Sequence, residues 1–157
     1  MNRVDLAALT FEQDRPDRPD GFRAAMARLG PGLGAQRTGA SVYELPPGQA
    51  VCPYHYELGE EEWVLVLQGS ATVRTPDGET EVGPDVLLFF STGPAGAHQI
   101  RNASAETVRI LMWSNVVFPT GTVYPDSDKV GLYTRDAQDD LIVRRSSRVG
   151  YFEGEEG

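Results

Sequence analysis

The stretch PPGQAVCPYHYELGEEEWVLVLQG, Pro46 to Gly69, decides the fold. It holds one of the two histidines of the chain, His55, and a run of three carboxylates, Glu60 to Glu62, which precedes the apolar segment Trp63 to Leu67. A polar segment, an acidic run and an apolar segment that ends at a glycine predict a strand, a turn and a second strand.

Candidate metal ligands lie on both of these predicted strands. Side chains alternate between the two faces of a strand, so His55 and Glu57 point to the same side. On the next strand Glu61 and Glu62 point to opposite faces, so only one of them can point inward. The second histidine, His98, follows the Gly/Pro-rich turn in STGPAGAHQIRN. Two histidines and two carboxylates are the ligands expected of a divalent transition metal such as Mn, Fe, Co, Ni or Zn.

These residues resemble the two motifs of the cupin superfamily, a class of small β-barrels. The first motif is G-x5-H-x-H-x3-4-E-x6-G. Glu62 and Gly69 fit its end, which favours Glu62 over Glu61, and His55-x-Glu57 stands where the family has H-x-H. Glu57 therefore replaces a histidine, which adds a negative charge to the site.

The second cupin motif is G-x5-P-x-G-x2-H-x3-N. Gly83 opens it, Gly93 supplies the turn glycine, and His98 and Asn102 have the family spacing. This motif also departs from the family, because Ser91 takes the proline position and the segment before His98 is longer by two residues. The resemblance covers about residues 40–115. We interpret Asn102 as a turn residue and Glu60 and Glu61 as solvated charges.

The resemblance implies an all-β fold, a single double-stranded β-helix (jelly-roll) barrel with extensions at both ends. We expect an N-terminal extension over 1–35, the barrel over 36–118, and a C-terminal extension over 119–157 that packs on the barrel or on a partner subunit. It also implies a metal site formed by His55, Glu57, Glu62 and His98.

Outside the motifs, short apolar or alternating segments at roughly 8–12 residue spacing fit a barrel. Phe22 to Leu29 is compatible with a short helix or an edge strand. Pro76-Asp77-Gly78 predicts a hairpin turn. The continuous apolar segment Val86 to Phe90 predicts a strand that is buried on both sides or lies against the barrel interior.

Charge and composition exclude several classes of partner. The chain has 157 residues, 14 basic and 23 acidic, and a net charge of −9. A negative field of this size argues against nucleic acid and against an anionic membrane surface. There is a single cysteine, Cys52, and the N-terminus lacks the pattern of a signal peptide, so we expect a cytoplasmic protein.

Two functions compete on the sequence. In the first, the protein is an enzyme whose metal acts on a small molecule in the barrel, with dioxygenase-like or isomerase-like chemistry implied by the resemblance. Two carboxylates and two imidazoles around a divalent ion favour a neutral or weakly anionic substrate. In the second, the barrel is a non-catalytic module that binds a small molecule such as a sugar. A third, weaker alternative is a barrel that has lost its metal. The resemblance and the long C-terminal tail suggest a homodimer.

Overall fold

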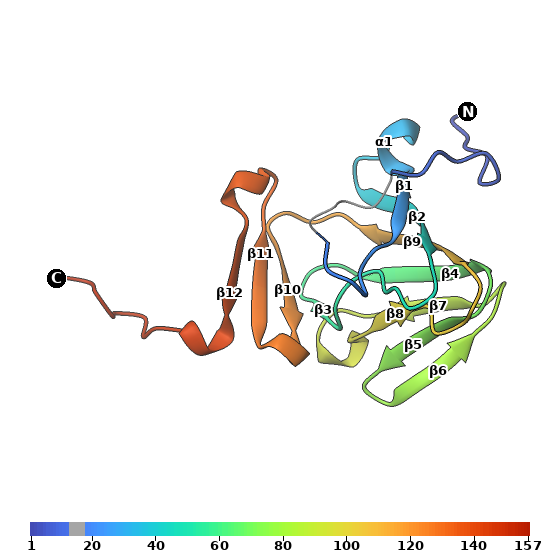
Figure 1. Cartoon of the computed structure of the whole chain (residues 1–157). Coiled ribbons are helices and arrows are strands. Elements are labelled where there is room, and N and C mark those ends of the chain that lie inside the picture. Colours follow the sequence, from blue (N-terminus) through green and yellow to red (C-terminus); the bar gives the residue numbers. More distant parts are fainter. Residues whose placement is uncertain (13–17) are drawn as a thin grey trace.

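The computed structural model describes residues 1–12 and 18–157, and its strands form three antiparallel sheets (Figure 1). One sheet has the order β1-β2-β9-β4-β7, the second β12-β11-β10-β3, and the third β6-β5-β8. The strands are β1 (Ala25–Arg28), β2 (Thr38–Leu45), β3 (Tyr56–Glu57), β4 (Glu62–Gln68), β5 (Ala71–Thr75), β6 (Gly78–Val82), β7 (Leu87–Phe90), β8 (Gln99–Arg101), β9 (Val108–Asn115), β10 (Thr120–Tyr124), β11 (Lys129–Tyr133) and β12 (Leu141–Arg144).

Helical segments are short and lie between the strands. The α-helix is α1 (Gly30–Leu33), and the 3-10 turns are η1 (Pro94–Gly96), η2 (Pro125–Ser127), η3 (Ala137–Asp139) and η4 (Arg145–Ser147). Within residues 1–12 and 18–157, no helix is long and apolar enough to cross a bilayer. The antiparallel sheets agree with the expected jelly-roll barrel.

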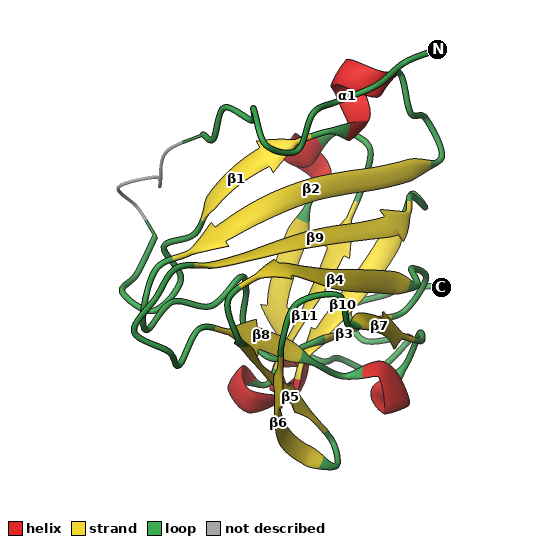
Figure 2. Ribbon diagram, turned by 90° about the vertical axis from the view of Figure 1, so that its right-hand side faces the viewer, coloured by secondary structure: helices red, strands yellow, loops and turns green. Residues whose placement is uncertain are grey.

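The five-stranded sheet forms one wall of the barrel, and its register fixes which side chains face inward (Figure 2). Residues directly opposite one another in neighbouring strands share a face. Val64 lies opposite Met112, which lies opposite Ser41, and Val66, Ile110 and Tyr43 form the next row. Val64 and Val66 are 1% and 0% exposed, so this face is the interior.

The interior is filled by aliphatic side chains from the facing sheets. Burial of such side chains contributes roughly 1.5–3 kcal/mol each. The fully enclosed aliphatic ones are Leu45, Val64, Val66, Ile100, Val108 and Ile110.

Gly69, which ends β4, is required by its surroundings. Its φ is 77°, in the left-handed region that favours glycine, and a Cβ there would lie 3.1 Å from the Thr107 carbonyl oxygen. The motif glycine thus allows the chain to turn closely past the start of β9.

Three expectations about individual strands can be compared with the structure. Of the two alternatives for Phe22 to Leu29, the edge strand is found, because β1 pairs with β2. The hairpin around Pro76-Asp77-Gly78 is confirmed by the pairing of β5 with β6. β7 has one side against the core, at Phe90, while Leu87 and Phe89 on the other side are 51% and 46% exposed. Burial on both sides was therefore wrong.

The C-terminal strands stand beside the barrel. β10 pairs with β3, β11 with β10, and β12 with β11. In Figure 1 this sheet extends away from the barrel, and the tail after β12 continues in the same direction. All four residues of β12 are exposed.

Candidate metal centre

His55 and His98 are joined through their backbones. The amide of each histidine donates a hydrogen bond to the carbonyl of the other, at 3.1 Å and 2.8 Å, in an isolated antiparallel bridge. Both side chains are buried, and their ring centroids are 4.7 Å apart. The fold therefore brings the two histidines of the chain to one point, although they are distant in sequence.

Each imidazole ring is also oriented by a carbonyl two residues earlier in the chain. Nδ1 of His55 lies 3.0 Å from the Pro53 oxygen, and Nδ1 of His98 lies 2.9 Å from the Gly96 oxygen. A proton on Nδ1 that bonds to a carbonyl leaves Nε2 free as a ligand, the usual arrangement around metal-bound histidines. Both rings are thus fixed with Nε2 directed into the site.

Gly96 is the residue that positions His98. A Cβ at this glycine would lie 1.7 Å from the Ser91 carbonyl oxygen, so no other residue fits. This close approach holds the Gly96 carbonyl where the ring of His98 bonds to it. Phe90 stacks on the other side of that ring, with centroids 3.8 Å apart.

Glu62 supplies the carboxylate nearest to both rings. Its Oε2 lies 2.8 Å from Nε2 of His98, and ligand atoms of His55, Glu62 and His98 all lie within 4.8 Å of one another. Glu61 is exposed, and its amide bonds to Asn115. Of the two alternatives on this strand, the structure places Glu62 in the site.

Glu57 lies at the edge of the cluster. Its Oε1 is 3.4 Å from Nε2 of His55, while its Oε2 accepts a hydrogen bond of 2.6 Å from the Thr122 hydroxyl. Glu57 does not belong to the three-residue group whose ligand atoms lie within 4.8 Å. It reaches one histidine only, and its role as a ligand remains a prediction.

A cavity of about 350 Å³ opens beside His55 and Glu57. Its other wall comes from the end of β9, the segment after it, β10 and β11. The lining residues from those segments are Ser114, Val116, Phe118, Thr120, Thr122, Tyr124 and Tyr133, and Cys52 and Glu60 complete it.

Two polar groups in this cavity stand out. The Thr120 side chain is 8% exposed, and its Oγ1 has no hydrogen-bond partner among the described residues. This oxygen is closed off from solvent and lies next to Gly59, so it is a buried polar group whose cost nothing in the described residues offsets. Glu60 is only partly exposed and accepts a 3.0 Å hydrogen bond from the Val117 amide. It is thus a cavity residue and not the fully solvated charge expected from the sequence.

The proton affinities of these groups are shifted by their neighbours. Burial disfavours the charged ring of His55, but the Cys52 sulfur and the Glu57 carboxylate outweigh it and raise the pKa of His55 to about 11. Partial burial raises the pKa of Glu60 against the opposing effect of the Val117 amide. Burial and the hydrogen bond with Tyr133 raise the pKa of Tyr124. A metal at this site would have to displace a proton from His55.

The sequence reasoning missed the contribution of β10. Thr120, Thr122 and Tyr124 line the cavity, yet they lie in the segment expected to be an extension. Their spacing of two residues is a strand signal that could have placed them on one face. The pairing of β10 with β3, which brings that face to His55, has no local signal in the sequence.

Comparisons with known proteins agree with this architecture. Residues 41–114 match the model of the cupin domain family. A proposed sugar phosphate isomerase from Acidithiobacillus ferrooxidans is 25% identical, with a TM-score of 0.75 over 82% of this chain and 81% of that chain. No curated protein sequence matches the chain.

Two further solved structures share the fold. A cupin-superfamily sugar phosphate isomerase from Silicibacter pomeroyi is 21% identical, with a TM-score of 0.79 over 92% of this chain and 94% of that chain. The polyketide cyclase RemF from Streptomyces resistomycificus is 24% identical, with a TM-score of 0.60 over 76% and 83%. Residues 41–114 of this protein thus form a cupin domain.

Proposed function

We propose that the protein binds a divalent transition metal through His55, Glu62 and His98, with Glu57 as a fourth ligand or as a partner of His55. The observation that carries this proposal is the convergence of the three ligand atoms within 4.8 Å. The donor set fits such an ion, because both rings are fixed through Nδ1 and both Nε2 atoms are left for coordination.

We propose further that the protein acts as an isomerase on a small hydroxylated carbonyl compound. A divalent ion in the site would act as a Lewis acid toward a carbonyl or hydroxyl oxygen. Glu60 faces the same cavity and is placed to carry a proton between neighbouring carbon or oxygen atoms. The neighbour from Acidithiobacillus ferrooxidans supports isomerase over dioxygenase chemistry.

Metal analysis tests the first part of the proposal. The purified protein, loaded with Mn, Fe, Co, Ni or Zn, is expected to hold close to one ion per chain. His55→Ala and His98→Ala should each lower metal affinity at least about tenfold, because each removes a ligand. Glu61→Ala is the matched control, since this neighbouring carboxylate is exposed, and it should leave the affinity unchanged. A parent that takes up none of these ions would refute the metal site.

Isotope exchange tests the isomerase. A metal-loaded isomerase that moves a proton should exchange substrate C–H hydrogen with deuterated water. Glu60→Gln should retain the metal and lose about a hundredfold in exchange rate. The alternative, a non-catalytic binding module, predicts binding of the same compounds with no exchange in either protein.

We also propose that two copies associate through β12. The Arg145 amide, just after β12, donates to the carbonyl of Asp128, just before β11, at 2.9 Å. Because hydrogen bonding alternates along an edge strand, the backbone groups of Ile142 and Arg144 face the open edge. Leu141 and Ile142 are 53% and 54% exposed, so this edge is apolar as well as unpaired.

The sequence around β12 is complementary to itself in charge. In an antiparallel pair with a two-fold axis at Ile142, Asp140 lies opposite the partner's Arg144. Asp139 then lies opposite the partner's Arg145, and Leu141 opposite the partner's Val143. This pairing uses the same outward backbone groups on both copies, as a symmetric dimer requires.

Molecular mass in solution tests the dimer. Ile142→Lys should convert a dimer into a monomer in analytical ultracentrifugation, because it places two like charges at the axis. Asp139→Arg with Asp140→Arg should weaken the dimer, and adding Arg144→Asp with Arg145→Asp should restore it. A parent that is monomeric at all concentrations, or a dimer unaffected by Ile142→Lys, would contradict this interface.

A further inference from the structure

A second groove, of about 940 Å³, lies next to the candidate metal centre. It is bounded by β1, α1 and β2 on one side and by the segment after β9 on the other. Val116 and Phe118 line both this groove and the smaller cavity beside His55. The two spaces therefore meet at these two residues.

The basic residues of this groove set it apart from the rest of an acidic protein. Arg18, Arg28, Arg37 and Arg135 line it, and none of its described lining residues is an aspartate or glutamate. The chain as a whole has 14 basic against 23 acidic residues. Four guanidinium groups around one carboxylate-free groove are unexpected against that background, and they create a local positive field.

Three of these arginines, Arg28, Arg37 and Arg135, have no ion pair with another described residue. Arg135 lies over the ring of Phe118, with 5.5 Å from its guanidinium carbon to the centroid, which brings it to the junction of the two cavities. Their guanidinium groups remain available to a ligand.

The register of the sheet relates the groove to the metal site. Arg28 lies opposite Ser41, in the cross-strand row that continues to Met112 and Val64 on the interior face. The adjacent row contains Glu62. β1 and β4 are three strand spacings apart, about 14 Å, part of which the arginine side chain spans. A small molecule of several bonds would therefore reach from the Arg28 guanidinium to the metal ligands.

Tyr43 also lines the groove. Burial, with the nearby Cys52 and Glu62, raises the pKa of its hydroxyl to about 12, and the opposing influence comes from Arg18 and Arg28. The same phenol thus responds to both the metal ligands and the arginines. As a neutral donor it can hydrogen-bond an anionic ligand.

We propose that this groove binds the phosphate group of a phosphorylated small molecule whose other end reaches the metal centre. Arg28 and Arg37 are the principal phosphate-binding residues, with Arg135 and Arg18 at the rim. Guanidinium groups match phosphate oxygens through paired N–H donors. This proposal rests on the proposed function in one respect, because the other end of the bound molecule is taken to react at the metal centre. It also revises the expectation of a neutral or weakly anionic substrate, because the phosphate would lie away from the two metal-binding carboxylates.

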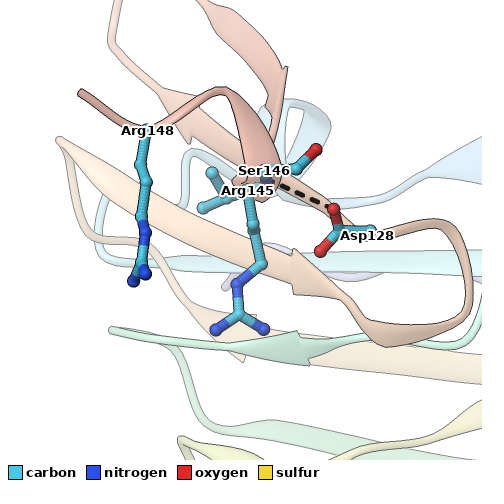
Figure 3. A pocket seen from close by; sticks show the side chains of 5 residues that line it. Asp128, Arg145, Ser146 and Arg148 are labelled. Atoms are coloured by element: carbon cyan, nitrogen blue, oxygen red, sulfur yellow. Dashed lines mark hydrogen bonds between the residues drawn. The ribbon is translucent and has the colours of Figure 1, made fainter.

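Two exposed arginines outside the groove, Arg3 and Arg148, provide a matched control. Arg148 lines a pocket with Arg145 and Asp128, and its guanidinium group extends away from that carboxylate (Figure 3). Asp128 accepts a hydrogen bond from the Ser146 amide at 3.3 Å. Arg145 is left unchanged because it belongs to the interface proposed through β12. Arg3 and Arg148 report non-specific anion binding.

The test is a titration of metal-free and metal-loaded protein with inorganic phosphate and with ribose 5-phosphate against ribose. Binding is monitored by nitrogen–proton NMR spectra of the protein, recorded at constant ionic strength. Shifts are expected at residues 28–41 and at the arginine Nε groups, and ribose 5-phosphate should bind at least about tenfold more tightly than ribose. Arg28→Gln with Arg37→Gln should weaken phosphate binding at least about tenfold, whereas Arg3→Gln with Arg148→Gln should change it less than about twofold.

The outcomes separate this proposal from the proposed function. Equal binding of ribose and ribose 5-phosphate, or equal losses in both double variants, would overturn the phosphate site. Phosphate binding that depends on Arg28 and Arg37 in a protein that takes up no metal would sustain the groove and refute the metalloenzyme. All four substituted arginines are exposed, and circular dichroism would show that the variants remain folded.

Discussion

β4 and β12 are both apolar strands, but they have different surroundings. In β4, Val64 and Val66 are 1% and 0% exposed. In β12, Leu141 and Ile142 are more than half exposed. Glu62 shares the buried face of β4 with Val64 and Val66, and β4 lies between β9 and β7, while β12 pairs with β11 only. An apolar segment thus predicts a strand, and what covers the strand decides whether its residues stabilise the fold or bind a partner.

The largest difference in unfolding free energy is expected between alanine substitutions of two isoleucines, one in the barrel interior and one on β12. Ile110→Ala is expected to cost about 2–5 kcal/mol of unfolding free energy, because it leaves a cavity in the closed interior. Ile142→Ala should cost less than about 0.5 kcal/mol in the monomer, since that side chain already contacts water. Urea unfolding at low protein concentration would measure both. Similar losses would mean that β12 is covered even in the monomer.

An intermediate difference in unfolding free energy is expected between substitutions in two turns, the one that contains Asn102 and the one that forms η3. The side-chain Nδ2 of Asn102 donates to the Leu45 and Glu106 carbonyls, and its Oδ1 accepts from the Ser104 backbone amide. Asn102→Ala should cost about 2–3 kcal/mol, because it leaves buried carbonyls without donors. In the C-terminal sheet, Asp136 caps η3 by accepting from Gln138, and Asp136→Ala should cost about 0.5–1 kcal/mol.

Thermal unfolding of both variants would measure this difference. An Asn102→Ala protein as stable as Asp136→Ala would show that water replaces the lost donors. The turn would then be less enclosed than the 1% exposure of Asn102 indicates.

The smallest change in unfolding free energy is expected for the ion pair that joins the sheet β6-β5-β8 to η2, the turn between β10 and β11. Arg74 on β5 contacts Asp126 in η2 at 2.5 Å, and this hydrogen bond lowers the pKa of Asp126. Because the folded pKa is below the unfolded value, the pair stabilises the fold above about pH 4 and this contribution is lost as pH falls through the folded pKa. Both groups are exposed to solvent, so the contribution is within about 0.5 kcal/mol.

Asp126→Asn is the corresponding variant. Its stability should differ slightly from that of the parent at pH 7, and the difference should disappear near pH 2 and in about 1 M salt. A difference that persists in acid or in salt would have a cause other than this ion pair.

The sequence predicted the barrel and the centre of the site because both depend on local spacing. The spacing of Glu62 to Gly69 in the cupin motif favoured Glu62 over Glu61, and the turn before His98 placed that ring at the start of a strand. The cavity wall from Thr120 to Tyr124 could not be predicted in the same way, because it depends on the pairing of β10 with β3. The arginine groove combines residues from 18 to 135 and has no local pattern at all.

The reciprocal bonds between His55 and His98 have a consequence for the opening of the barrel. They close the chain segment that contains β4 to β7 into a loop, and each of the two amides is protected only while the other histidine is in place. Opening this end of the barrel would expose both amides in one event and separate the two rings at the same time. We therefore expect their hydrogen exchange rates to rise together under mild denaturant, so that loss of the site and opening of the loop are a single transition.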